Sequence, residues 1–176
     1  MRTGAVSEFR RAIGLDEIED GGVHRTIEAG AEEREALARR FDLLAIDALS
    51  ASVRVRRMSG GPLVRVEGRL TADVVQRCVV TLAPLSVHIE EDFAGTFGPD
   101  GYRAPDGGDD TEVPEVFDDG GIDLGEFAAQ YLSLSLDPYP RAPDADVVQR
   151  PGTDEDTGDQ RRPFATLGEL MQRRRK

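Results

Sequence analysis

Residues 53–67 read VRVRRMSGGPLVRVE, and this stretch decides the fold. Valine alternates with charged residues on both sides of the Ser-Gly-Gly-Pro sequence at 59–62. Such alternation places apolar side chains on one face of a strand and charged ones on the other, and Gly and Pro favour a tight turn. The stretch therefore predicts a β-hairpin with one buried and one solvated face.

The extended pattern continues after this hairpin. Residues 74–82 and 85–90 form two further apolar-rich runs, and Pro84 marks the break between them. Together with the hairpin they predict an antiparallel sheet that has one face in water. His88 shares the solvated face with Ser86 and Glu90 in this pattern, so we expect an exposed histidine.

A short strand and a helix are expected before the hairpin. Residues 23–29 predict the strand, and helical spacing begins at Ala31, where Glu32 and Glu33 lie in a first turn that favours carboxylates. The apolar side of this helix is expected to contain Leu37, Phe41, Leu44 and Ala48.

A second helix is predicted after Asp123, which has the spacing of a capping box to Glu126. Its apolar stripe is expected to contain Leu124, Phe127, Tyr131 and Leu134.

These elements predict a single α+β domain, for which a chain of 176 residues is long enough. We expect an antiparallel β-sheet or partly open β-barrel with flanking helices, a long acidic loop and a flexible C-terminal tail. Residues 1–140 would form the domain, including the loop at 98–121, which is rich in Gly, Pro and Asp. Residues 141–163 would be a flexible linker, and 164–176 a short helix with a basic tail.

Charge is unevenly distributed along the chain. The formal net charge of -12 opposes general attraction to phosphate backbones, since nucleic-acid affinity comes mainly from Lys and Arg. Residues 100–126 hold ten acidic side chains against Arg103, a net charge of −9, whereas residues 161–176 hold six basic side chains against Glu169, a net charge of +5. Either the two segments bind different partners, or both are solvated stretches that keep the protein soluble.

No constellation of catalytic or metal-binding residues is recognisable in the sequence. Cys78 is the only cysteine, and His24 and His88 are the only histidines, so no paired ligand motif exists. No nucleophile elbow or phosphate-binding loop is present either. We therefore expect no metal, no cofactor and no enzymatic activity, and we interpret Cys78 as a small apolar core residue.

The sequence also lacks signs of export. Residues 1–15, MRTGAVSEFRRAIGL, carry charges where a signal peptide needs an apolar run. No segment approaches the roughly 18 to 20 apolar residues that span a bilayer. We expect a cytoplasmic protein that binds neither membranes nor DNA.

Three ordered segments resemble a known family. They are VEGRLTADVVQRCVVTLAPLSVHIEEDF at 66–93, GIDLGEFAAQYLSLSLDPYP at 121–140 and RPFATLGELMQRRRK at 162–176. They are similar in order and spacing to the YceD family of bacterial proteins, which are described as large ribosomal RNA subunit accumulation proteins. The positions that carry the resemblance include Gln76, Arg77, Cys78, Asp123, Leu124, Pro163, Phe164 and Leu167.

The resemblance implies a mainly β domain with flanking helices and a role in accumulating large-subunit ribosomal RNA. Many members carry a Cys-x-x-Cys at the central motif, with His and Cys after the later helix, which looks like a zinc site. Here Val75 stands at the first central position, and the stretch 137–148 has neither His nor Cys. The departure suggests a branch of the family that folds without zinc.

We therefore expect a non-enzymatic factor in ribosome biogenesis that binds a large-subunit rRNA precursor or a basic ribosomal protein. The alternatives are an acidic protein-interaction adaptor with no ribosomal role, and a nuclease or hydrolase that acts through carboxylates. The candidate contacts with RNA or a partner are the basic residues near the C-terminus, namely Arg161, Arg162, Arg173, Arg174, Arg175 and Lys176.

Overall fold

A computed structural model describes residues 7–19, 21–59, 61–102, 114–117, 121–143 and 145 of the chain. The chain divides into two units, Met1–Ala145 and Asp146–Lys176, and all described residues belong to the first. Most of the predicted acidic loop and linker, and the whole of the predicted C-terminal helix and tail, lie outside the described residues.

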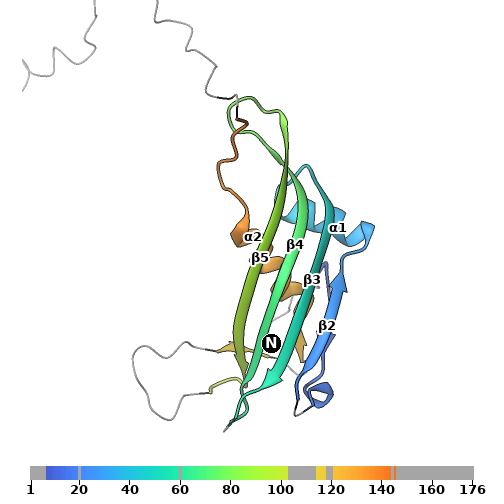
Figure 1. The fold of residues 1–176 in the computed structure, drawn as a ribbon, viewed down its shortest axis with the longest axis vertical. Coiled ribbons are helices and arrows are strands. Elements are labelled where there is room, and N and C mark those ends of the chain that lie inside the picture. The colour runs from blue at the N-terminus through green and yellow to red at the C-terminus, as the bar shows by residue number, and fades with distance from the viewer. Residues whose placement is uncertain are drawn as a thin grey trace, which may run out of the picture. The chain divides into compact units, whose positions relative to one another are not determined.

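The first unit contains a curved sheet with two α-helices (Figure 1). In chain order, the elements are β1 (Ala12–Ile13), the 3-10 helix η1 (Leu15–Glu17), β2 (Val23–Glu28), α1 (Ala31–Arg40), β3 (Ala45–Arg57), β4 (Val64–Arg77), β5 (Pro84–Gly98), β6 (Glu115–Val116), β7 (Ile122–Asp123) and α2 (Leu124–Ser135). The predicted α+β class is confirmed.

The main sheet has five strands in the order β2-β3-β4-β5-β6. All neighbours are antiparallel except β5 and β6, which are parallel. β2 and β6 lie at the two edges, so the sheet is open rather than closed into a barrel. A separate two-stranded sheet joins β1 to β7. The predicted antiparallel sheet is therefore confirmed, with one short parallel strand added from within the predicted acidic loop.

The hairpin of residues 53–67 lies at the β3–β4 turn, as predicted. Val55 pairs with Val66, and Arg54 pairs with Glu67. The valines of both strands are buried in the core, whereas the charged residues between them face away from it. Alternation in the sequence therefore assigned each side chain to the correct face.

The prediction of a separate strand at 74–82 is wrong. Residues 74–77 are the end of β4, which is a single strand of 14 residues. The next residues turn back on themselves, since the Leu82 amide donates to the Cys78 carbonyl at 2.9 Å and Leu82 has a φ of 62°. β-branched residues favour strands, but here the chain forms a turn in which Val79 and Val80 are 45% and 43% exposed, so the apolar run continues neither the strand nor the core.

The first helix is shorter than predicted. α1 ends at Arg40, and Asp42 has a φ of 54°, which carries the chain out of the helix. Leu44 is 42% exposed and Ala48 lies in β3 opposite Asp73, so neither extends the apolar side of the helix. Pairing of this segment with β4 replaces the helical hydrogen bonds that its spacing predicted.

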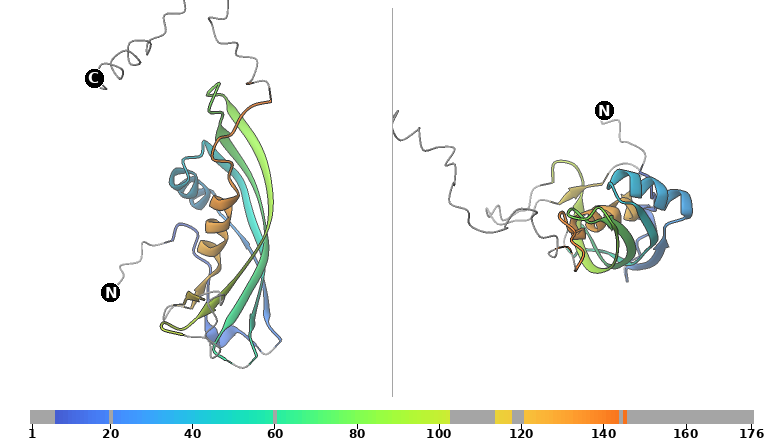
Figure 2. Two further views of the ribbon diagram at one scale, coloured as in Figure 1. Left: turned by 90° about the vertical axis from the view of Figure 1, so that its left-hand side faces the viewer. Right: turned by 90° about the horizontal axis from the view of Figure 1, so that it is seen from above.

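Both α-helices lie on the concave side of the sheet (Figure 2). Four rings fill the space between α2 and β5, and their centroids are 5.0 to 5.5 Å apart. They belong to Phe93, Phe97, Phe127 and Tyr131. The Phe127 ring lies on Gly95, where a Cβ atom would be 2.5 Å from Phe127 Cζ. This glycine therefore allows the helix to approach the strand closely.

The second helix matches its predicted range, but two details differ. The Glu126 carboxylate forms bonds of 2.8 and 2.7 Å with the Arg40 guanidinium instead of returning to the Asp123 amide, so the capping box is only half formed. Leu134 is 77% exposed and does not continue the buried stripe. The buried stripe instead includes Ala128 and Leu132, because the sheet extends along that side of the helix.

Candidate functional site

The convex face of the sheet carries no helix among the described residues (Figure 2). Alternate residues of β2 to β5 point to this face, and they are mostly charged or small polar residues. Their cross-strand register divides the face into rows, each containing one residue from neighbouring strands. The sequence predicted a solvated face but not how its charges combine.

Three arginines gather at one end of this face. His24, Arg54 and Glu67 occupy one row, and Arg56 and Arg65 occupy the next. We call Arg54, Arg56 and Arg65 the arginine cluster. Three positive charges surround the single carboxylate of Glu67, which leaves a net charge of +2, with His24 counted as neutral. The cluster is therefore electropositive although the whole chain has a charge of -12.

Glu67 is shared between two of the arginines. Its Oε1 atom lies 3.3 Å from Arg65 Nε and 3.7 Å from an Arg56 terminal nitrogen. Arg65 also donates to the Thr96 hydroxyl at 3.1 Å, which orients its guanidinium. Arg54 has no ion-pair partner within the described part of the chain. The cluster therefore retains donors that can bind an anion.

Arg56 and Arg65 lie directly opposite each other in the β3–β4 ladder. Like charges at this position repel each other and destabilise a sheet. An oxyanion bound between the two guanidiniums would relieve that repulsion, and guanidinium groups match phosphate oxygens through paired hydrogen bonds. Glu67 already offsets part of this repulsion, and the net charge of +2 that remains can attract a further anion.

The middle of the same face is acidic. Glu28 and Glu90 occupy one row, and Asp73 and His88 lie opposite each other in the next row on β4 and β5. His88 Nδ1 and Asp73 Oδ1 are 2.6 Å apart, and this hydrogen bond raises the pKa of His88. The prediction of an exposed His88 is confirmed, since its side chain is 56% exposed.

The family-motif residues at the end of β4 have structural contacts. Gln76 is only 6% exposed and donates from Nε2 to the Asp137 carbonyl at 2.9 Å. Arg77 points to the solvated face, and Cys78 is fully buried. The buried residues hold the chain that follows α2 against the end of the β4–β5 hairpin, where the Val79 amide also donates to the Pro140 carbonyl at 2.9 Å.

Cys78 is buried as predicted, but it acts as more than an apolar residue. Its Sγ atom accepts hydrogen bonds from the Thr81 amide at 3.5 Å and from the Ala142 amide at 3.3 Å. Hydrogen bonding from Thr81 and from these amides stabilises the thiolate and lowers the pKa of Cys78 to about 7.

A zinc site of the kind that the family resemblance implies does not fit these residues. Val75 lies on the convex face of β4, and the groups around Cys78 Sγ are amide donors, which cannot ligate a cation. The residues that the structure describes contain no group of three or more His, Cys, Asp or Glu side chains able to hold a metal ion. Backbone amides that donate to the Cys78 sulfur therefore lie where further metal ligands would be needed.

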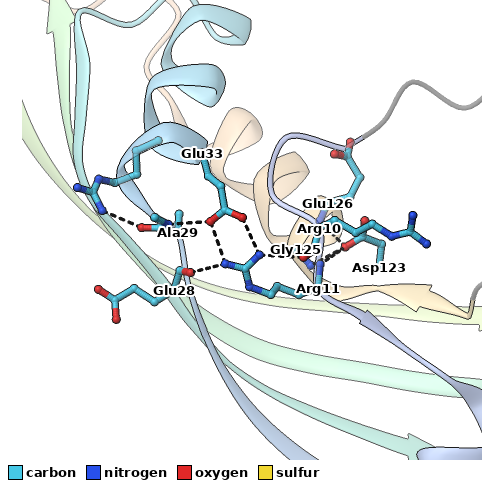
Figure 3. A network of polar contacts seen from close by, with 10 residues as sticks. Arg10, Arg11, Glu28, Ala29, Glu33, Asp123, Gly125 and Glu126 are labelled. Carbon is cyan, nitrogen blue, oxygen red and sulfur yellow. Dashed lines mark hydrogen bonds and ion pairs between the residues drawn. The ribbon is translucent and has the colours of Figure 1, made fainter.

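Asp123 and Leu124 position α2 rather than a ligand. Asp123 Oδ1 accepts from the Gly125 and Glu126 amides at 3.1 and 3.2 Å, which caps the helix. The same oxygen accepts from the Arg11 amide at 2.8 Å, and the Leu124 amide donates to the Arg11 carbonyl at 3.0 Å (Figure 3). Leu124 is buried in the core. These family-motif residues therefore join the N-terminal segment to α2.

The Arg11 side chain extends this junction to α1 and β2 (Figure 3). Its guanidinium forms two bonds to the Glu33 carboxylate, at 2.7 and 2.8 Å, and donates to the Glu28 carbonyl at 2.8 Å. The bond from Arg11 lowers the pKa of Glu33. With its partners satisfied, this arginine is structural, in contrast to the arginine cluster.

The remaining predicted site residues lie outside the described residues. They are Arg161, Arg162, Pro163, Phe164, Leu167, Arg173, Arg174, Arg175 and Lys176. The sequence pattern alone does not single out the arginine cluster as a site. A signal existed in the alternating arginines of residues 53–67, but only the register brings Arg56 opposite Arg65.

The fold and these contacts define an α+β protein with a curved, open sheet and a charged convex face. The chain belongs to the family of the large ribosomal RNA subunit accumulation protein YceD, whose family model matches residues 66–171. No curated protein and no solved structure matches the chain. None of the described helices is long and apolar enough to cross a membrane.

Proposed function

We propose that this protein supports the accumulation of large-subunit ribosomal RNA in the cytoplasm by binding, without catalysis, and that its arginine cluster contacts phosphates of an rRNA precursor. The family name supports the ribosomal role. The net charge of +2 on the arginine cluster, and the lack of an ion pair at Arg54 within the described residues, support the phosphate contact.

The surrounding charges make the proposed contact selective. Acidic residues in the middle of the convex face repel a backbone that would otherwise run along the whole sheet. RNA would therefore approach at the cluster end, where Thr96 and Glu67 orient the Arg65 guanidinium. A guanidinium that is already oriented in this way loses less side-chain freedom on binding, which favours affinity.

A binding assay with matched variants tests this proposal. The cluster variant Arg54→Gln/Arg56→Gln/Arg65→Gln and a control variant would be compared on a transcript of precursor large-subunit rRNA by filter binding. The control, Arg10→Gln/Arg39→Gln/Arg141→Gln, removes the same charge from exposed arginines that have no ion pair within the described residues. We expect the cluster variant to lose at least tenfold in affinity, because three phosphate contacts disappear.

The control variant should bind within about twofold of the unmodified protein at the same salt concentration. Equal losses in both variants would mean that only the total charge matters, and the cluster would have no special role.

The cellular test is sucrose-gradient profiling with and without the gene. We expect fewer large subunits without it and comigration of the protein with their precursors. A protein confined to the light fractions beside normal subunits would contradict the ribosomal role and favour the adaptor alternative.

A further inference from the structure

One long edge of the main sheet is unpaired within the described residues. β5 runs from Pro84 to Gly98, but β6 pairs only with Phe97 and Gly98 (Figure 1). The Tyr131 hydroxyl donates to the Ala94 carbonyl at 2.7 Å. From Pro84 to Asp92, the outer edge of β5 has no hydrogen-bonded neighbour in the part of the chain that the structure describes.

The direction of the free backbone groups follows from these contacts. Ala94 and Gly98 present their carbonyls to this edge, and the register of β5 with β4 is unbroken from Pro84 to Phe97. Backbone groups along a strand alternate in direction, so His88, Glu90 and Asp92 present their amides and carbonyls to the same edge. The backbone groups of these three alternate residues can therefore form hydrogen bonds with an added strand.

A groove lies beside this free edge, between β5 and the last turn of α2. Val87 and Ile89 line it from β5, and Tyr131, Leu134 and Ser135 line it from α2. Leu134 is 77% exposed although it lies on a helix whose other leucines are largely buried. A strand added to β5 would cover Leu134 with the side chains that point toward the concave side.

Acidic side chains border the groove. The convex side of the edge carries Glu90 and Asp92, of which Asp92 is ion-paired with Arg69 at 2.6 Å, and Glu91 points to the concave side. Charged residues on an edge strand prevent pairing with apolar or acidic strands, including a second copy of the same strand. They do not oppose a basic strand, since opposite charges in cross-strand pairs are favourable.

We propose that the free edge of β5 binds an extended basic segment of a partner protein as an additional strand. Basic side chains of the segment lie beside Glu90 on the convex side, and its apolar side chains cover Leu134. The expected sequence therefore alternates basic and apolar residues. This surface lies on a different strand from the arginine cluster, and its function does not depend on RNA binding.

A labelled peptide of alternating Lys and Val residues tests the proposal with the full chain, by fluorescence anisotropy. We expect saturable binding that weakens as salt is added. Glu90→Lys should weaken it about tenfold, through lost attraction and added repulsion. The control Glu35→Lys makes the same charge change on an exposed residue of α1 and should leave binding unchanged. Leu134→Ser should weaken binding several-fold, because it removes apolar contact.

Two N-methylated peptides show whether backbone bonding is involved. One carries N-methyl groups on its lysines and the other on its valines, so each removes the donors from one edge of the peptide strand. Addition to β5 uses only one edge, so one of the peptides should lose binding and the other should retain it. Equal binding of both would mean that charge alone holds the peptide, and the proposal would be wrong.

The remaining outcomes separate this inference from the proposed RNA contact. The cluster variant Arg54→Gln/Arg56→Gln/Arg65→Gln should bind the peptide normally. If the unmodified protein binds precursor rRNA but does not bind the peptide, this inference is wrong while the proposed RNA contact stands. A dimer in size-exclusion chromatography that excludes the peptide would show that a second copy covers the edge, which would also overturn it.

Discussion

Cys78 combines complete burial with an unusually acidic thiol. Two backbone amides reach its sulfur from segments that are far apart in sequence, at Thr81 and at Ala142. Hydrogen bonds of this kind favour the thiolate over the thiol. The residue therefore connects the β4–β5 hairpin to the chain after α2 through a sulfur acceptor.

A thiolate titration tests this description of Cys78. Absorbance at 240 nm should show a midpoint near pH 7 in the folded protein and a higher midpoint in urea, because the folded pKa is lowered to about 7. Cys78→Ser supplies the baseline, since it has no thiolate. The same midpoint in both states would show that the amides do not stabilise the charge.

The lowered pKa of Cys78 also determines how this residue makes stability depend on pH. The pKa of Cys78 is lower in the folded state, so the unfolded state binds more protons between pH 7 and the ordinary cysteine pKa. The contribution of Cys78 to the free energy of unfolding is therefore present at alkaline pH and is lost as the pH falls through about 7. The difference in free energy of unfolding between the unmodified protein and Cys78→Ser, measured by urea denaturation, should therefore become smaller toward acidic pH.

Packing of α2 on β5 depends on a position without a side chain. The Phe127 ring occupies the space above Gly95, and it forms edge-to-face contacts with Phe93 and Phe97. A glycine inside a strand weakens the strand, but here it admits an aromatic ring from the helix. The close approach of helix and strand also brings Tyr131 to the Ala94 carbonyl.

Gly95→Ala should therefore destabilise the protein by about 1 to 3 kcal/mol, because the new Cβ atom would overlap the ring. Urea denaturation measures the change. Ala94→Ser, one residue away, should cost no more than about 0.5 kcal/mol. The cost of Gly95→Ala should fall when Phe127→Leu is also present, and an undiminished cost would mean that another contact is responsible.

The elements themselves were largely predictable, and the errors have physical causes. The β3–β4 hairpin and α2 follow from periodic patterns in which each residue's neighbours determine its face. The end of α1 and the extent of β4 were mispredicted, because pairing between strands outweighs helical spacing at residues 44–48 and continues the strand to Arg77. The cap residue Asp123 was predictable because a helix cap contacts amides only two or three residues further along the chain.

At the scale of the whole molecule, charge separates by sign along the convex face and along the sequence. The arginine cluster lies at one end of the sheet, and the sequence places a second basic segment at 161–176, outside the described residues. A protein with a net charge of -12 can contact phosphate only where such groups concentrate. The two basic regions are therefore separate candidates for the same RNA.

Salt dependence tests the contribution of the basic C-terminal residues. Replacing Arg161, Arg162, Arg173, Arg174, Arg175 and Lys176 by Gln should reduce the slope of log affinity against log salt. Each lost phosphate contact should remove about 0.7 to 0.9 from that slope. The slope is measured with precursor rRNA across a salt series, with the cluster variant beside it. An unchanged slope would mean that these residues are only solvated.

The sequence alone determined what depends on near neighbours. The alternation of residues 53–67 assigns the faces of the central strands, the stripe after Asp123 assigns α2, and three ordered segments identify the family. Only the tertiary structure places Arg56 opposite Arg65, brings Ala142 to Cys78 and leaves most of the β5 edge unpaired among the described residues. These features join residues that are distant in the chain, and strand register and docking decide such contacts, whereas local periodicity does not.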